Sequence, residues 1–172
     1  MAITEASREV GVVVRRRSVD NPWVDEVWSP TLILDEVPAA APWTVLSTEG
    51  EATTYYAGAA SIELFGAETA NYRDNLADGA PRIWIALRRQ DGGAELELTK
   101  VTADPTEGEA MFESGCDVLG TVPMPPGIAS WIAAFVDRFH VERVFHKRRR
   151  DRATGERPRV PDGPRDEGTG RS

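Results

Sequence analysis

The sequence contains little that would support metal-dependent or thiol chemistry. It has one cysteine, Cys116, and two histidines, His140 and His146. The histidines do not share a helix face, and structural zinc usually takes four Cys or His ligands. Cys116 precedes Asp117, and a neighbouring carboxylate disfavours the reactive thiolate. We therefore predict no metal site, no cofactor and no catalytic cysteine, and a lone thiol suits a reducing compartment.

The common catalytic motifs are also missing. The chain has no C-x-x-C, H-E-x-x-H or G-x-S-x-G motif, and the segment 115–120 matches neither a P-loop nor a dinucleotide fingerprint. Carboxylates are abundant, at 28 Asp and Glu, so pairs such as Glu63 with Glu68 or Asp104 with Glu107 arise by chance. We predict no catalytic residues, and a small enzyme with a carboxylate site stays as an alternative.

Long apolar runs are absent as well. The longest is Ile128 to Val136. It is far shorter than a membrane-spanning helix, which requires about 20 residues. The first ten residues carry Glu5, Arg8 and Glu9 and have no apolar core of a secretory signal. We therefore expect a cytoplasmic protein that makes no contact with a membrane.

The charges are divided unequally along the chain. Of 20 basic and 28 acidic residues, Arg143 to Ser172 hold 10 basic and 5 acidic ones, which leaves a strongly acidic body. From His146 onward large apolar side chains are nearly absent, so this stretch cannot bury enough surface to fold. We predict a flexible N-terminus (1–9), a single α+β domain (10–145) and a disordered basic tail (146–172).

Short β-branched and aromatic runs predict a mainly antiparallel sheet. In the clearest hairpin, residues 83–87 and 96–101 flank Asp91-Gly92-Gly93, whose glycines accept the positive φ of a tight turn. Hairpin-like strands with few helices are typical of the α+β class. Further strands are expected at 10–14, 27–35, 43–47 and 53–64.

Three helices are expected beside the sheet. A short one covers 68–76, and a second begins after Asp104, which suits the N-cap with Pro105 in the first helical position. A proline-containing loop then leads to an amphipathic C-terminal helix. Its apolar residues form one face about three turns long, and we expect this helix to pack across the sheet. They are Ile128, Trp131, Ile132, Phe135, Val136 and Phe139.

Two features suggest contact with a partner. Trp23 and Trp28 lie in the turn-containing stretch 21–28, and exposed aromatic side chains often anchor protein interfaces. The second feature is a basic run that suits an acidic protein surface or nucleic acid, although the acidic body would repel a duplex. The alternatives are a tryptophan pair that covers the core and a solvated tail. The basic run consists of Lys147, Arg148, Arg149, Arg150 and Arg152.

Several short motifs in a fixed order resemble one bacterial family, the domains of unknown function numbered 3305. The similarity covers about Val10 to Arg152. The motifs are Asn21-Pro22-Trp23, Glu26-Val27-Trp28, Tyr56-Ala57-Gly58, Glu68-Thr69 with Tyr72, Val101-Thr102-Ala103 with Pro105, Val122 to Pro125, Ala134 to Val136, His140 to Glu142, Phe145, and Lys147 to Arg149.

The resemblance implies a role but no catalytic residues. Members of this family are typically encoded beside genes for molybdenum-dependent formate dehydrogenase and its maturation factors. This implies a non-catalytic accessory or assembly protein that binds the molybdenum and iron–sulfur enzyme or those factors. A nucleic-acid-binding regulator that uses the basic tail is the other alternative, and we expect a protein rather than nucleic acid as the partner.

Overall fold

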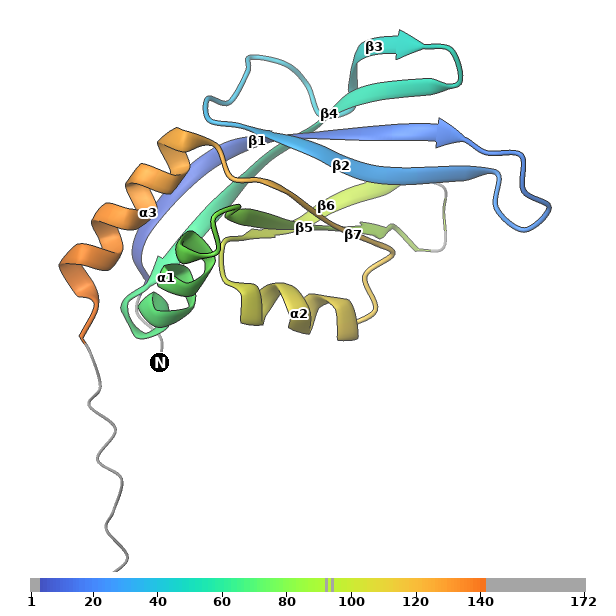
Figure 1. Ribbon diagram of the computed structural model, residues 1–172. Helices are drawn as coiled ribbons and strands as arrows, with labels where there is room; N and C mark the ends of the chain where they lie inside the picture. The colour runs from blue at the N-terminus through green and yellow to red at the C-terminus, as the bar shows by residue number, and fades with distance from the viewer. Residues whose placement is uncertain (1–3, 92, 94, 142–172) are drawn as a thin grey trace, which may run out of the picture. The chain divides into compact units, whose positions relative to one another are not determined.

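The computed structural model describes residues 4–91, 93 and 95–141 of the chain (Figure 1). The predicted basic tail, and with it the basic run, lies outside the described residues. Within them the fold is α+β, as predicted. The elements are β1 (Thr4–Ser18), β2 (Glu26–Leu34), β3 (Thr44–Glu49), β4 (Ala52–Phe65), η1 (Gly66–Glu68), α1 (Thr69–Ala77), β5 (Arg82–Arg89), β6 (Leu96–Thr102), α2 (Pro105–Glu113), β7 (Val118–Pro123) and α3 (Pro126–Phe139).

The strands form two antiparallel sheets. The first has the order β2-β1-β4-β3, and the second has the order β6-β5-β7 (Figure 1). Alternate residues of β1 point into the core, where Val10, Val12 and Val14 are almost fully buried. In the second sheet, β5 and β6 pair as the predicted hairpin, but the positive φ expected at the glycines of its turn lies at Asp91, at 40°, and not at Gly93, while Gly92 lies outside the described residues. The far ends of β1 and β2 extend past β6.

The flexible N-terminus predicted for residues 1–9 is corrected by the structure. β1 begins at Thr4, and Ala6 to Glu9 pair with Leu64 to Ser61 of β4. Arg8 forms an ion pair with Asp35 across the sheet. Charged side chains such as those of Arg8 and Glu9 are compatible with a strand, because alternate residues of a strand point to its exposed side.

The strand β7 was missed, because its sequence reads as part of a proline-containing loop. Val118 to Pro123 pair antiparallel with β5 over six residues. Gly120 of β7 lies against Pro30 of β2, and a methyl group at Gly120 would be 2.7 Å from the Pro30 Cδ atom. The glycine therefore lets the two sheets approach each other at this edge.

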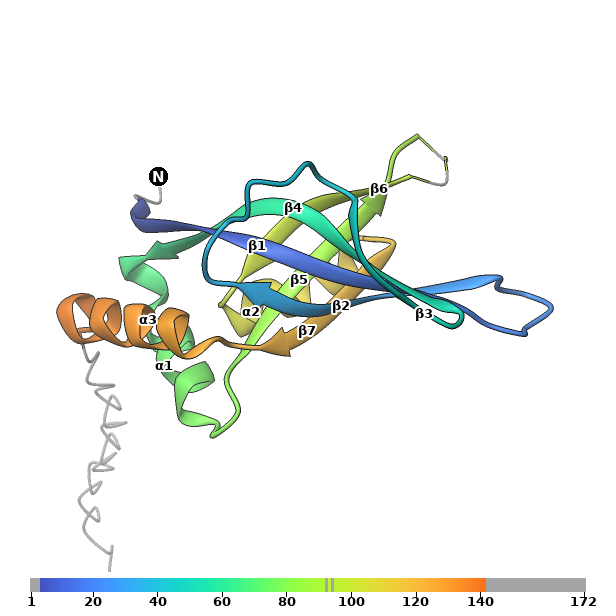
Figure 2. The ribbon, with the colours of Figure 1, turned by 90° about the horizontal axis from the view of Figure 1, so that it is seen from above.

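The helices cover one end of the core and the outer face of the second sheet. α2 lies against β5 and β6, and its Gly108 makes room for the Trp84 ring. The Asp104 carboxylate caps α2 by accepting from the Thr106 and Glu107 amides, as predicted. α3 buries Ile128, Ile132, Phe135 and Val136 of the predicted apolar face, and Trp131 and Phe139 are half-buried. The main neighbour of this helix is α1 (Figure 2). No helix in the described part of the chain is long and apolar enough to cross a membrane.

Three irregularities bend the first sheet at one level. The register shifts between Val13 and Val14 against β2, between Val12 and Val13 against β4, and between Val45 and Ser47 against β4. Gly58 has a φ of 127°. Only glycine adopts such a conformation without strain. β-Bulges of this kind increase the local bend of a strand. They occur where the first sheet faces the beginning of β6.

Candidate functional site

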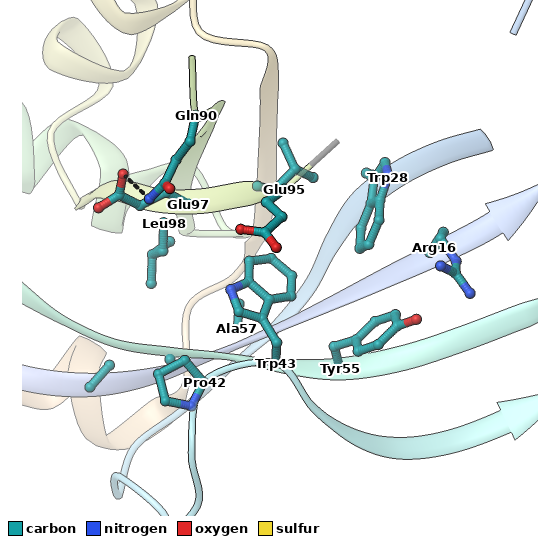
Figure 3. Close-up of a pocket in the computed structure, with 13 residues that line it drawn as sticks. Arg16, Trp28, Pro42, Trp43, Tyr55, Ala57, Gln90, Glu95, Glu97 and Leu98 are labelled. Carbon is teal, nitrogen blue, oxygen red and sulfur yellow. Dashed lines mark hydrogen bonds between the residues drawn. The ribbon is translucent and has the colours of Figure 1, made fainter. Parts of the chain in front are cut away.

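A pocket of about 680 Å³ lies between the bent part of the first sheet and the beginning of β6 (Figure 3). One wall carries aromatic and basic side chains from β1, β2, β4 and the residue before β3. The other wall carries carboxylates and leucines from β6 and the residue before it. The main lining residues are Arg16, Trp28, Trp43, Tyr55, Glu95 and Leu98.

Three aromatic rings form the first wall. The rings of Trp28 and Trp43 meet edge to face, with centroids 5.9 Å apart at 88°. Tyr55 lies 5.6 Å from Trp28 and 6.2 Å from Trp43. These separations are typical of favourable aromatic pairs. All three side chains are only half-buried, so the cluster is an ordered surface rather than part of the closed core.

Arg16 extends this wall as a stacked cation. Its guanidinium carbon lies 5.7 Å from the Trp28 ring centroid and 5.5 Å from that of Tyr55. Both distances are within the range of cation–π attraction. A Glu26 oxygen lies 3.9 Å from the Arg16 guanidinium, at the limit of an ion pair. The guanidinium therefore packs on the rings of Trp28 and Tyr55, whereas the Trp43 ring stays open to the pocket.

Trp43 is held in a backbone conformation that bulky residues rarely adopt. Its φ is 68°, in the left-handed region, and its amide donates a hydrogen bond to the Tyr56 carbonyl. Such conformations cost about 1–3 kcal/mol and are concentrated at functional sites. This backbone conformation directs the indole into the pocket, where it lies between Pro42 and Glu95 (Figure 3).

The opposite wall is acidic. Glu95 extends its carboxylate toward the Trp43 ring, whereas Glu97 turns aside and accepts a hydrogen bond from the Gln90 amide at 3.0 Å (Figure 3). Both glutamates are exposed to solvent. A carboxylate beside an open aromatic face suits a cationic or hydrogen-bonding group from outside the chain.

Comparison with known proteins identifies the family of this chain. The model of the family described as "Protein of unknown function (DUF3305)" matches residues 9–149. The chain belongs to this family. Neither the search of curated proteins nor that of solved structures found a match.

Motif residues of this DUF3305 chain contribute to the pocket. Trp28, Ala57 and Gly58, which are among the residues that carry the family resemblance, line it. Trp28 also packs against the core, as the alternative interpretation of the tryptophans holds, while its contact with a partner stays a prediction. The Trp28 indole N–H is buried and meets no acceptor among the residues that the structure describes.

Trp23 does not join the pocket. It lies in the turn between β1 and β2, where its amide donates a hydrogen bond to the Asn21 side chain. Its side chain is 90% exposed. The structure therefore separates the two tryptophans that the sequence analysis grouped. The other predicted contact residues, Lys147 to Arg150 and Arg152, lie outside the described residues.

Three of the four carboxylates considered for catalysis, Glu68, Asp104 and Glu107, have structural roles. Asp104 caps α2 and also accepts from Asn71, while Glu107 contacts Lys100 and the Thr102 hydroxyl. Glu68 accepts a hydrogen bond from Asn71 at 3.0 Å. Within residues 4–91, 93 and 95–141, no three Cys, His, Asp or Glu side chains gather as metal ligands.

Cys116 is tied to the end of α2. Its thiol lies 3.2 Å from the Met111 carbonyl oxygen, to which it donates. The thiol group therefore satisfies the helix end, and it is not among the residues that line the aromatic pocket.

Most of the pocket is not predicted from the sequence. No sequence pattern singles out Arg16, and Trp43 and Tyr55 fall only within the expected strands 43–47 and 53–64. One pattern that identifies part of the site is the Tyr55-Tyr56 pair. Adjacent strand residues face opposite sides, so one of the two must leave the core. Tyr56 is the buried one, and burial raises its pKa above the usual value.

Proposed function

We propose that this protein is a non-catalytic accessory protein that binds a protein partner through the aromatic pocket. The observation that carries the proposal is the half-exposed cluster of Trp28, Trp43 and Tyr55, with Trp43 in a strained conformation. Trp, Tyr and Arg are the residue types that dominate binding energy at protein interfaces. Arg16, Trp28 and Tyr55 lie on strands, which hold side chains more firmly than loops do, and Trp43 directly precedes β3.

The partner we propose is molybdenum-dependent formate dehydrogenase or one of its maturation factors, in the cytoplasm. This part rests on the gene neighbourhood typical of the family. An assembly factor has to hold its client for a time and then release it. The pocket is half-exposed and has a volume of about 680 Å³. A few aromatic anchors rimmed by charges suit such a reversible contact.

Complementation of a deletion strain tests this proposal. Without the gene, formate dehydrogenase activity and the molybdenum content of the enzyme should fall, and the wild-type gene should restore both. A Trp43→Ala gene should fail to restore them at equal protein level, because the main anchor is gone. Phe112→Ala is the matched control, since Phe112 is 77% exposed on α2 and takes no part in the pocket.

Two outcomes would count against the proposal. Unchanged activity and molybdenum content in the deletion strain would remove the link to formate dehydrogenase. Full restoration by Trp43→Ala would remove the pocket from the contact. Trp23→Ala in the same strain tests the exposed tryptophan in the β1–β2 turn separately.

A further inference from the structure

A groove continues from the aromatic pocket along the seam between β4 and β6. The second depression, of about 450 Å³, shares Ala59 and Leu98 with the first and ends near Phe65 and Glu107. We propose that this groove binds an extended, basic segment of the protein partner. The inference deepens the proposed function, on which it rests, by naming the kind of segment that is recognised.

The length of the groove suits an extended peptide. Along β4 it runs from Ala57 to Phe65. A strand rises about 3.3 Å per residue, which gives a length of roughly 26 Å. An extended chain of about eight residues has the same length. Ala59, which lines both depressions, is exposed and carries only a methyl group, so the backbone of a bound segment can come close there.

Strand edges along the groove have vacant positions. β3 pairs with β4 only as far as Tyr56, so residues 57–65 pair with β1 on one side alone. β6 pairs with β5 alone. In the described part of the chain, no backbone hydrogen bond joins β4 to β6. Because β4 and β6 approach each other closely along this seam, a bound segment lies over the seam and adds its main-chain hydrogen bonds to the free edge of one of the two strands.

The charges of the groove favour a basic segment. Four carboxylates line the combined groove, from Glu63, Glu95, Glu97 and Glu107. The two cations there already have acidic neighbours, because Lys100 pairs with Glu107 and Arg16 lies beside Glu26. Glu63 and Glu95 are exposed and enter no ion pair within the described residues.

Glu95 and Trp43 together form the most specific point of the groove. The Glu95 carboxylate extends toward the Trp43 ring (Figure 3). An Arg or Lys side chain between them would gain both an ion pair and a cation–π contact. Glu63, further along β4, would hold a second basic side chain. Two cations spaced along an extended backbone are the pattern that we infer.

Selection from a random octapeptide library on the immobilised full-length protein tests this inference. We expect the enriched peptides to carry Arg or Lys. The best of them should bind the double variant Glu63→Gln/Glu95→Gln about tenfold more weakly than the wild type, because both unpaired carboxylates are lost. Glu109→Gln/Glu113→Gln removes the same charge from exposed positions on α2 and should leave binding unchanged.

The main-chain contribution has its own control. Replacing alternate residues of the best peptide by proline removes the N–H groups that face one strand edge, and it should abolish binding. Enrichment of peptides without basic residues, equal loss in both double variants, unchanged binding by the first double variant, or no enrichment at all would overturn the inference.

These outcomes are separable from the test of the proposed function. If Trp43→Ala fails to restore formate dehydrogenase and no basic peptide is enriched, the function stands and this inference falls. If basic peptides bind in the groove but Trp43→Ala restores the enzyme fully, the link between pocket and formate dehydrogenase falls instead.

Discussion

The aromatic pocket and the helical end of the core differ in how they use polar and aromatic groups. At the helical end, Tyr72 and Phe135 meet inside the core, and the buried Asn75 side chain has three hydrogen bonds. At the pocket, the aromatic rings are half-exposed and Trp43 is strained. Bulges interrupt the sheet there, whereas α1 and α3 pack regularly.

This difference separates stability from binding within one fold. Groups at the helical end satisfy one another, so changes there should reduce the free energy of unfolding. The side chains at the pocket are held in an arrangement that costs stability. Changes there should therefore weaken binding of the partner more than they lower the free energy of unfolding. Strain of this kind persists only where the surrounding structure holds it in place.

The largest effect on folding is expected for Asn75→Ala. The Asn75 amide donates to the Arg82 and Ala103 carbonyls at 2.8 and 2.9 Å, and its oxygen accepts from the Arg82 amide at 3.0 Å. Its removal leaves buried backbone groups unpaired, so the free energy of unfolding should fall by about 3 kcal/mol. Urea denaturation measures this, and Asn71→Ala on the same helix should cost no more than about 1 kcal/mol.

Tyr72 gives the helical end a dependence on alkaline pH. Burial, with smaller contributions from Asp104 and Glu68, raises the pKa of Tyr72 to about 12. The contribution of Tyr72 to the free energy of unfolding is complete below 10.0, its pKa in the unfolded chain. It is lost as the pH rises toward the folded-state pKa of about 12. The loss should reach about 2–3 kcal/mol.

Urea denaturation at several pH values between 9 and 12 checks this contribution. The stability difference between the wild type and Tyr72→Phe should shrink as the pH rises, because phenylalanine has no proton to lose. Phe112→Ala on α2, which removes no ionisable group, serves as the comparison and should keep the wild-type slope. If the free energy of unfolding changed with pH in parallel for the wild type and Tyr72→Phe, the result would contradict a Tyr72 hydroxyl that is buried and neutral in the folded protein.

The smallest effect on folding is expected at Trp43, together with the largest effect on binding. Trp43→Gly should be more stable than Trp43→Ala by about 1 kcal/mol, since glycine tolerates the positive φ and alanine does not. Both variants should lose the partner, because both lack the indole. Equal unfolding free energies of the two variants would argue against strain at this position.

The structural features that the sequence predicted correctly are those that local interactions determine. The capping of α2 by Asp104, the β5–β6 hairpin and the apolar face of α3 each depend on residues within a few positions of one another. The strand character of Thr4 to Glu9 depends instead on pairing with residues 61–65, which are distant in the sequence. Charged side chains in this stretch hid that pairing.

The candidate site depends on long-range register. Arg16, Trp28, Trp43 and Tyr55 belong to four segments that meet because three bulges set the pairing of β1 to β4. A bulge shifts every later side chain by one position, and no composition rule places it. The residue type of Trp28 suggested a partner contact from the sequence, but nothing there indicated its neighbours in the pocket.

Hydrogen–deuterium exchange of the full-length protein, with and without purified formate dehydrogenase, tests the central claim most directly. The account predicts that bound enzyme slows exchange in residues 42–59 and 95–102, while α1 and α3 keep their rates. Protection confined to α1 and α3, or no protection with an active enzyme preparation, would contradict the claim that the aromatic pocket is the binding surface.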